Sequence, residues 1–248
     1  MAQYMFGAGM MIAIPSVAIP TPRRLGTLQE TSIEFSGNIK ELFGQNQFAA
    51  ASARGQQKIT GKSKMANINM DTYNDLYFNE QIQIGQNLAN FDKAFIVDAT
   101  AHTVLAAGGT FLSDLGVMNY DGKPLTRIKV DATALPQLDE YSLDEATGKY
   151  TFNEALANKT VYVSYLYTDT TNGKTITINN QLMGEAPTFK GIFNGRFSGK
   201  QMTLILNNCV SSKLSLIGTK LEDFSIPEFD FSASANDANR VGTLSSAE

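Results

Sequence analysis

The chain has 248 residues, of which 43% are hydrophobic, and its 20 Lys and Arg against 24 Asp and Glu give a net charge of −4 and a pI near 5.1. This length can bury the core of one large all-β domain or two small ones, and the acidic balance excludes a surface that attracts duplex DNA strongly. With a single cysteine (Cys209) and a single histidine (His102), an intrachain disulfide framework and a cysteine-based zinc cluster are excluded, and no cofactor is expected.

The first apolar run extends from Tyr4 to Pro20. No Lys or Arg precedes it, prolines at 15 and 20 interrupt any long helix, and it is too short to span a bilayer. Positive charges follow it only at Arg23 and Arg24. We therefore expect residues 1–24 to form an extended N-terminal arm that needs a protein surface to cover it, and no membrane partner.

Alternation predicts strands at 31–35, at 39–43 and from about residue 57 to 67. The last of these contains Gly61-Lys62-Ser63, which looks like the end of a phosphate-binding P-loop. That motif needs a glycine five residues earlier, where Gln56 stands, and a preceding apolar strand, which is also missing. Lys58, Lys62 and Lys64 share one parity, so the segment is expected to be a strand. If the protein assembles from several copies, these lysines, with Arg23 and Arg24, are the candidate interface residues, because they could pair with acidic groups of a neighbouring subunit.

One short helix is expected over 71–78, because Tyr73, Leu76 and Tyr77 follow helical spacing and Asp71 can cap it. Strands resume at 93–105, 116–119 and 125–130. The 93–105 strand would separate Asp98 from His102 by roughly 13 Å, which argues against an acid–base pair and for an ordinary strand histidine. Cys209 is expected to be a small core or turn residue.

Four carboxylates, Asp139, Glu140, Asp144 and Glu145, precede Gly148 in the turn-rich stretch DEYSLDEATG. A pair of carboxylates could cleave a glycoside, but a solvated charged loop explains the cluster better, because the chain has no tryptophan to stack on a sugar. No catalytic, cofactor or metal site is predicted, and no small-molecule substrate.

The strongest strand pattern lies between 148 and 182, where the two faces of 161–168 are both apolar or aromatic and are expected to be covered. Asn172-Gly173 predicts a tight hairpin turn into a return strand at 175–178. Further strands are expected at 189–197, 202–206, 213–217 and 223–231. In the last of these a bulge at Pro227-Glu228 would bring Phe224, Ile226, Phe229 and Phe231 onto one face.

The pattern as a whole predicts an all-β fold, a β-sandwich or rolled sheet with one short flanking helix. We expect one β domain over 25–234, after the arm of residues 1–24 and before a polar C-terminal tail of residues 235–248.

Three stretches resemble bacteriophage major tail tube proteins. They are Arg24–Glu30 leading through IKELFGQNQFAAASARGQQKITGKSKMANI to NDLYF, the central ATGKYTFNEALANKTVYVSYLYT, and the C-terminal LSLIGTKLEDFSIPEFDFSASANDANRVGTLSSAE. The resemblance covers most of the chain and is one of pattern and order rather than of one short motif. Residues 81–90 and 108–121 are the least similar parts.

The resemblance implies a virion protein, made in the bacterial cytoplasm, that polymerises as stacked hexameric rings with strands joined in a continuous inner β-barrel. Its partners would be itself, a tape-measure protein, other tail proteins, and genomic DNA that passes without tight binding. Asp139, Glu140, Asp144 and Glu145 would then lie on the lumen wall or on an exposed rim. The alternative from the residues alone is a non-catalytic carbohydrate-binding β-sandwich of a surface or secreted protein. A hydrolase that uses the same four carboxylates is a third hypothesis.

Overall fold

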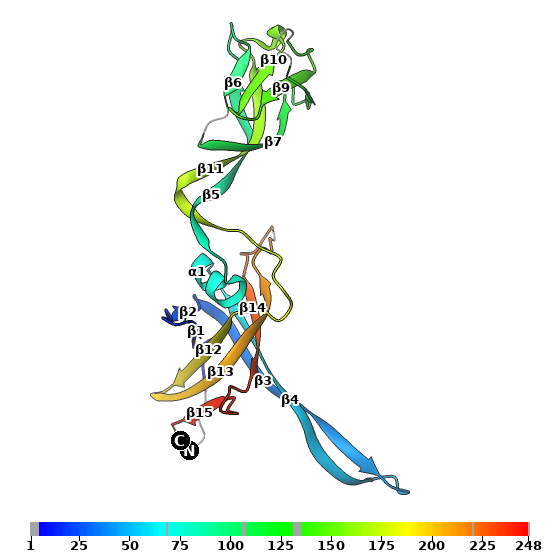
Figure 1. Ribbon diagram of the computed structural model, residues 1–248, viewed down its shortest axis with the longest axis vertical. Helices are drawn as coiled ribbons and strands as arrows, with labels where there is room; N and C mark the ends of the chain where they lie inside the picture. Colours follow the sequence, from blue (N-terminus) through cyan, green and yellow to red (C-terminus); the bar gives the residue numbers. More distant parts are fainter. Residues whose placement is uncertain (1–4, 68, 106–107, 131–134, 220, 248) are drawn as a thin grey trace. The chain divides into compact units, whose positions relative to one another are not determined.

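The computed structural model describes residues 5–67, 69–105, 108–130, 135–219 and 221–247, and these are mostly strand, with two short helical segments (Figure 1). They form two compact units. Unit 1 comprises residues 1–81 and 177–248, and unit 2 comprises residues 82–176. The single domain expected over 25–234 therefore appears as one unit inserted into another, a division that no composition change at residues 81 and 177 marks.

Unit 1 contains one eight-stranded sheet in the order β2-β1-β12-β13-β14-β4-β3, with β15 added to β13. Its strands are β1 (Met10–Pro15), β2 (Arg23–Arg24), β3 (Leu28–Phe43), β4 (Ala49–Met65), β12 (Thr188–Phe197), β13 (Lys200–Ser215), β14 (Glu228–Ser234) and β15 (Gly242–Ser246). All the pairings are antiparallel. In the described part of the chain the sheet is open, and β3 is an edge strand along its length.

The strand expected at 57–67 is confirmed as the second half of β4, and its alternation decides which side chains are buried. Ile59, Gly61, Ser63 and Met65 are buried, whereas the lysines of the other parity are not. Phe189, Phe193, Phe229 and Phe231 pack together in the core on the buried face, with ring centroids 5.6–6.1 Å apart in the contacting pairs.

The helix expected over 71–78 is present as α1 (Met70–Tyr73) followed by a π-helical turn, η1 (Asn74–Phe78). The cap is Asn69 rather than Asp71, since the Asn69 side chain accepts a hydrogen bond from the backbone N–H of Thr72. Tyr73 and Leu76 enter the core of unit 1 as their spacing predicts.

Both ends of the chain depart from their expected roles. The expected arm contributes β1 and β2 to the sheet, and Met11 and Ala13 on β1 are completely buried, because alternation places them against Phe189 and Phe193. The expected polar tail contributes β15, which pairs with β13 from Leu206 to Met202. Residues 1–4, which belong to the expected arm, and residue 248 of the tail lie outside the described residues.

Unit 2 contains a three-stranded sheet, β5-β11-β7, and a four-stranded sheet, β6-β10-β9-β8. The strands are β5 (Ile82–Ile96), β6 (Thr103–Leu105), β7 (Thr110–Met118), β8 (Thr126–Ile128), β9 (Glu140–Asp144), β10 (Lys149–Phe152) and β11 (Thr160–Ile176), with a 3-10 turn, η2 (Glu154–Leu156). One core lies between the sheets and includes Tyr141, Tyr150, Val161, Val163 and Tyr165.

The hairpin predicted at Asn172-Gly173 is wrong. β11 pairs with β5 up to Asp169↔Gln86, bulges, and resumes with the same strand at Lys174↔Ile84. The Asp169 side chain accepts the backbone N–H groups of Thr171 and Asn172 at 2.8 and 3.1 Å, which closes a local turn inside the strand. The Asn-Gly pair thus makes a bulge rather than a reversal of the chain.

Two further expectations are corrected. Residues 98–102 form a turn between β5 and β6 rather than strand, because the Asp98 carboxylate accepts the N–H groups of Thr100 and Ala101. The strand expected at 223–231 begins only at Glu228, so Phe229 and Phe231 are buried while Phe224 is 91% exposed. No bulge joins the four apolar residues on one face.

Candidate assembly surfaces

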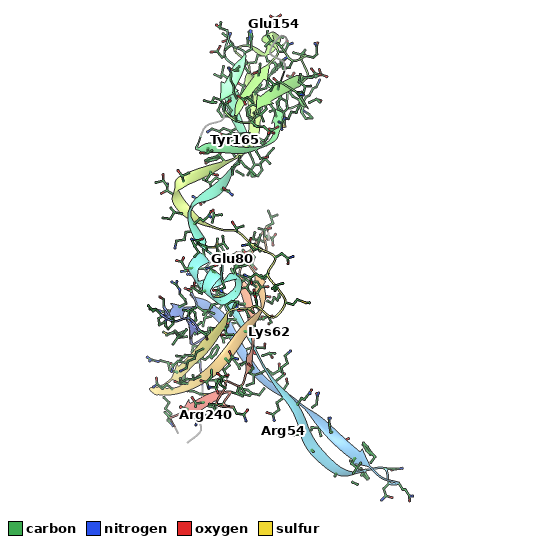
Figure 2. All side chains as sticks on the ribbon, viewed as in Figure 1. Arg54, Lys62, Glu80, Glu154, Tyr165 and Arg240 are labelled. Carbon is green, nitrogen blue, oxygen red and sulfur yellow. The ribbon has the colours of Figure 1, made fainter. Side chains whose placement is uncertain are left out.

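The β3–β4 ribbon, residues 35–58, extends beyond every other strand of unit 1 (Figure 1). Strand β14 accompanies β4 only as far as Ile59, and from there β3 and β4 pair only with each other. Side chains leave both faces of this ribbon, as around Arg54 in Figure 2, and nearly all of them are exposed. Its large exposed apolar side chains are Phe35, Ile39, Leu42, Phe43 and Phe48. Because a two-stranded ribbon has little stability alone in water, this one is expected to pack against another molecule.

A second group of exposed apolar side chains lies in the two connections at the other end of the same sheet. One connection joins β11 to β12 (residues 177–187), and the other joins β13 to β14 (residues 216–227). Their exposed large apolar side chains are Ile178, Leu182, Met183, Ile217, Leu221, Phe224 and Ile226. Exposed apolar groups at opposite ends of one sheet suit head-to-tail contacts between copies, which can propagate without closing.

The outward face of β3, β4, β14 and β13 carries alternating charges across the strands. One row runs from Glu228 of β14 through Lys64 to Glu30, and the next places Asp230 beside Lys62. Lys64 Nζ lies 2.7 Å from Glu30 Oε2, and Lys213 Nζ lies 2.9 Å from Glu228 Oε2. These hydrogen bonds raise the pKa of both lysines.

The predicted interface cations are therefore placed differently from one another. Lys64 is paired inside its own chain, and Arg23 pairs with Asp75 of η1 at 2.6 Å. Lys62, labelled in Figure 2, is exposed, and it is paired in register with Asp230 of β14. Lys58 is exposed at the base of the ribbon, and Arg24 is exposed on edge strand β2. The role of these residues at a subunit contact stays a prediction.

The four carboxylates of the predicted acidic cluster lie in unit 2, with Glu140 and Asp144 at the two ends of β9 and Asp139 and Glu145 just outside it. Glu140 accepts the N–H of Gln137, Asp144 accepts the N–H of Ala146, and Glu145 pairs with Arg127 at 2.7 Å. Asp139 is exposed in the turn before β9. Glu140 and Asp144 are four strand residues apart, roughly 13 Å, which exceeds the spacing of glycosidase carboxylate pairs. Three of the four carboxylates thus stabilise local turns and contacts.

Sequence reasoning missed a buried carboxylate in unit 2. Asp114 of β7 accepts hydrogen bonds from the hydroxyls of Tyr141 (2.7 Å) and Tyr150 (3.1 Å) and from the backbone N–H of Gly116 (3.0 Å). Two irregularities in the pairing of β7 with β11, near Leu112 and Leu115, shift the alternation and direct Asp114 inward. Both leucines are nearly half exposed as a result. The alternating pattern alone cannot reveal this shift.

Asp98 and Cys209, two residues that could in principle take part in catalysis, have structural roles instead. Backbone hydrogen bonds from Ala101 and Thr100 lower the pKa of Asp98, which is thus engaged in its turn beside His102. Burial raises the pKa of the Cys209 thiol to about 12, which suits the predicted core residue rather than a nucleophile.

No protein-family model matches the chain, and no curated protein matches it either. Among the residues that the structure describes, no three His, Cys, Asp or Glu side chains gather as metal ligands. No helix in this part of the chain is long and apolar enough to cross a membrane.

Proposed function

We propose that this protein is a structural subunit of a bacteriophage tail tube, which polymerises as stacked hexameric rings and conducts the genome during ejection. The proposal rests on the resemblance in the sequence and on one structural observation, the exposed β3–β4 ribbon. A subunit that functioned alone would leave Phe43 and Phe48 in water at the end of this ribbon, with Phe48 85% exposed.

The open sheet of unit 1 supports the same proposal. Strand β3 presents an unpaired edge sixteen residues long, and such an edge favours pairing with another chain. Six copies joined edge to edge would remove these free edges by closing a barrel. The tape-measure protein and other tail proteins would be its further partners, and the virion tail its location.

The test is the assembly of the purified full-length chain, viewed by negative-stain microscopy. We expect rings or tubes. A shortened variant replaces residues 38–56 by Asn-Gly, which joins the paired residues Gly37 and Gln57 through a two-residue turn. This variant should keep the far-ultraviolet spectrum of a folded β protein and sediment as small species.

A matched control replaces Asn46 at the ribbon tip by Ser, which removes no apolar group and should leave polymers unchanged. Monomeric wild-type protein that binds a glycan array would instead favour the carbohydrate-binding alternative. Monomers at all concentrations, without glycan binding, would contradict both hypotheses.

A further inference from the structure

The sequence contains two Asn-Gly pairs, Asn172-Gly173 in β11 and Asn194-Gly195 in β12. The side chain of an asparagine can be attacked by the backbone nitrogen of the next residue, and glycine shields that nitrogen least because it has no Cβ. The attack closes a five-membered ring, so the backbone and the side chain must rotate until the asparagine Cγ meets the nitrogen. Whether either pair reacts therefore depends on how firmly the fold holds it.

The pair at 194–195 is held on both sides by the sheet of unit 1. Asn194 is paired in register with Met10 of β1 and with Thr203 of β13. Its side chain donates a hydrogen bond to the Thr203 hydroxyl at 2.8 Å. A rotation that closes the ring at Asn194 would have to break this bond and disturb two strand pairings, so the fold protects this asparagine.

The pair at 172–173 lies in the bulge of β11 instead. Residues 170–173 have no partner in the described pairing of β11 with β5, which stops before them and resumes after them. Asn172 and Gly173 are both exposed, and Gly173 has a φ of +83°. The ladder that protects Asn194 is therefore missing around Asn172.

One side chain, that of Asp169, restrains Asn172 in the bulge. The Asn172 side-chain Nδ2 donates to Asp169 Oδ2 at 2.9 Å, in addition to the two backbone N–H groups that bond to Asp169 Oδ1. These bonds, first that of the Asn172 side chain, lower the pKa of Asp169, so its carboxylate is ionised at neutral pH. Rotation of the Asn172 side chain toward Gly173 must first break the bond to Oδ2.

We infer that Asn172 is a deamidation site whose reaction Asp169 slows, and that the reaction opens the bulge irreversibly. The Gly173 N–H gives its proton to water and the nitrogen attacks Asn172 Cγ. The new N–Cγ bond forms as the Cγ–Nδ2 bond breaks, and Nδ2 leaves as ammonia. A water molecule then opens the cyclic imide at one of its two carbonyls, which leaves aspartate or isoaspartate at position 172.

The product no longer fits the bulge. A carboxylate takes the place of the amide that bonded to Asp169 at 2.9 Å, so a donor is lost and two negative charges repel each other. Three pairs of the β5–β11 register follow the bulge, from Lys174↔Ile84 to Ile176↔Ile82, and the loss of the turn beside them loosens them. This inference concerns unit 2 alone and does not depend on the proposed function.

Peptide mapping of the aged protein tests the site. Full-length wild-type protein is incubated folded in alkaline buffer and unfolded in urea, and isoaspartate is quantified by mass spectrometry at both pairs. In the folded protein we expect isoaspartate at Asn172 to form roughly tenfold or more faster than at Asn194, because reaction at Asn194 needs the ladder to open. In urea both pairs should react at similar rates. Absence of isoaspartate at Asn172 in the folded protein while the unfolded chain reacts, or equal folded rates at the two pairs, would overturn the inference.

The role of Asp169 has its own control. Asp169→Ala should speed the reaction at Asn172 by about threefold to tenfold, the factor expected for the loss of one hydrogen bond of ordinary strength. Asp98→Ala is the matched control, because Asp98 also accepts two backbone N–H groups in a turn of the same unit, and it should leave the rate at Asn172 unchanged. An unchanged or lower rate in Asp169→Ala would contradict the restraint.

Hydrogen exchange measures the opening of the bulge. Asn172→Asp places the product's charge in the chain, and the backbone N–H groups of residues 174–176 should exchange severalfold faster than in the wild type, an effect that added salt reduces. Asn172→Ser removes the bond to Asp169 without adding charge and should have a smaller effect. Equal exchange in the two variants would contradict the repulsion, and wild-type exchange in Asn172→Asp would contradict the opening.

Discussion

At the scale of single residues, Gly61 has a role in core packing that its place in a P-loop-like Gly-Lys-Ser triplet did not reveal. A methyl group added at Gly61 would lie 1.9 Å from the ring of Phe231, so the glycine makes room for a core aromatic. The neighbouring Lys62 is exposed on the opposite face. The Gly-Lys-Ser triplet thus consists of a small core residue, a surface cation and a buried serine on alternating sides of β4.

We predict that Gly61→Ala lowers the free energy of unfolding of unit 1 by about 1–3 kcal/mol, the usual effect of overpacking a core. Gly44→Ala is the matched control, because nothing lies within 4 Å of the added methyl there. Urea unfolding followed by tyrosine fluorescence measures both. Equal stability of the two variants would show that Phe231 moves away freely.

Lys62→Ala tests the same residues for nucleotide binding. We expect no ATP or GTP binding by calorimetry in either wild type or variant, because the strand offers no loop of backbone N–H groups to a phosphate. Saturable binding that the substitution abolishes would contradict the strand role. Any effect should appear in assembly instead, where Lys62 can face a neighbouring subunit.

The two tyrosines that bond to Asp114, Tyr141 and Tyr150, should make the stability of unit 2 depend on pH in the alkaline range. Burial, together with the adjacent Asp114 carboxylate, raises the pKa of Tyr141 and Tyr150 above the ordinary value of 10.0. The unfolded chain therefore releases these protons at a lower pH than the folded chain does. The stabilisation is complete below about pH 10 and is lost as the pH rises through the folded-state pKa values.

We predict a fall in the melting temperature of unit 2 above about pH 10, measured by near-ultraviolet circular dichroism. Tyr141→Phe should make this fall shallower, since one of the two shifted hydroxyls is removed. Tyr120→Phe, a partly exposed tyrosine of the same unit, serves as the control and should keep the wild-type slope. Identical slopes for all three proteins would argue against the Asp114 network as the cause.

At the scale of elements, the sequence predicted well those strands whose alternation is local. The two parities of β4 and the helical spacing of Tyr73 and Leu76 both led to the observed burial. The errors lie where the outcome depends on a distant partner. Asn172-Gly173 does make a turn, but whether the chain then reverses depends on β5, which takes up Lys174 again. Phe224 and Phe231 look alike in sequence, and only the start of β14 separates them.

The surroundings of the charged side chains were harder to predict than the strands. The sequence offered Lys64 and Arg23 as candidates for subunit contacts, which stays a prediction, but it did not reveal that both form ion pairs within the chain. Their partners, Glu30 and Asp75, lie 34 and 52 residues away. The length of the exposed ribbon could not be predicted from the sequence either, because it depends on where β14 ends beside β4.

Because β1 is part of the core sheet, an N-terminal deletion that removes β1 should have a different effect from one that keeps it. Deletion of residues 1–15 removes Met11 and Ala13 from the core and exposes the edge of β12, so we expect a clear loss of stability, about 2–5 kcal/mol for Met11 alone. Deletion of residues 1–9 keeps β1 and should leave a folded protein that assembles poorly, because it removes the exposed apolar side chains of Met5 and Phe6. Thermal unfolding and sedimentation distinguish the two. A fully stable protein without residues 1–15 would contradict the role of β1.

At the scale of the whole molecule, the net charge is unevenly divided. Unit 1 contains 13 Lys and Arg and 13 Asp and Glu, whereas unit 2 contains 7 and 11, so the net charge of −4 belongs to unit 2. The polar face of the unit 1 sheet is itself balanced, with Glu30, Glu34, Glu228 and Asp230 against Lys58, Lys62, Lys64 and Lys213. A tube wall built from this face would be neutral rather than acidic.

The balance of acidic and basic side chains on this face determines how strongly a tube lined by it would bind DNA. Each lysine that neutralises a phosphate releases counterions and adds affinity, so a conduit must not present unpaired cations. Lys64 and Lys213 already contact carboxylates of their own chain, at 2.7 and 2.9 Å. We predict that assembled wild-type tubes bind duplex DNA only weakly, at micromolar or higher concentrations, in a co-sedimentation assay at physiological salt.

Removal of the balancing carboxylates should reverse this behaviour. Glu30→Gln with Glu228→Gln leaves Lys64 and Lys213 without their partners, and the tubes should then retain DNA in a manner that added salt abolishes, because the interaction is screened beyond roughly 10 Å. Glu222→Gln with Asp223→Asn removes the same amount of charge from the connection between β13 and β14 and is the control. Tight, salt-sensitive binding of duplex DNA by the wild-type tube would contradict the conduit mechanism. Unchanged weak binding by the Glu30 and Glu228 variant would instead show that this face lies away from the path of the DNA.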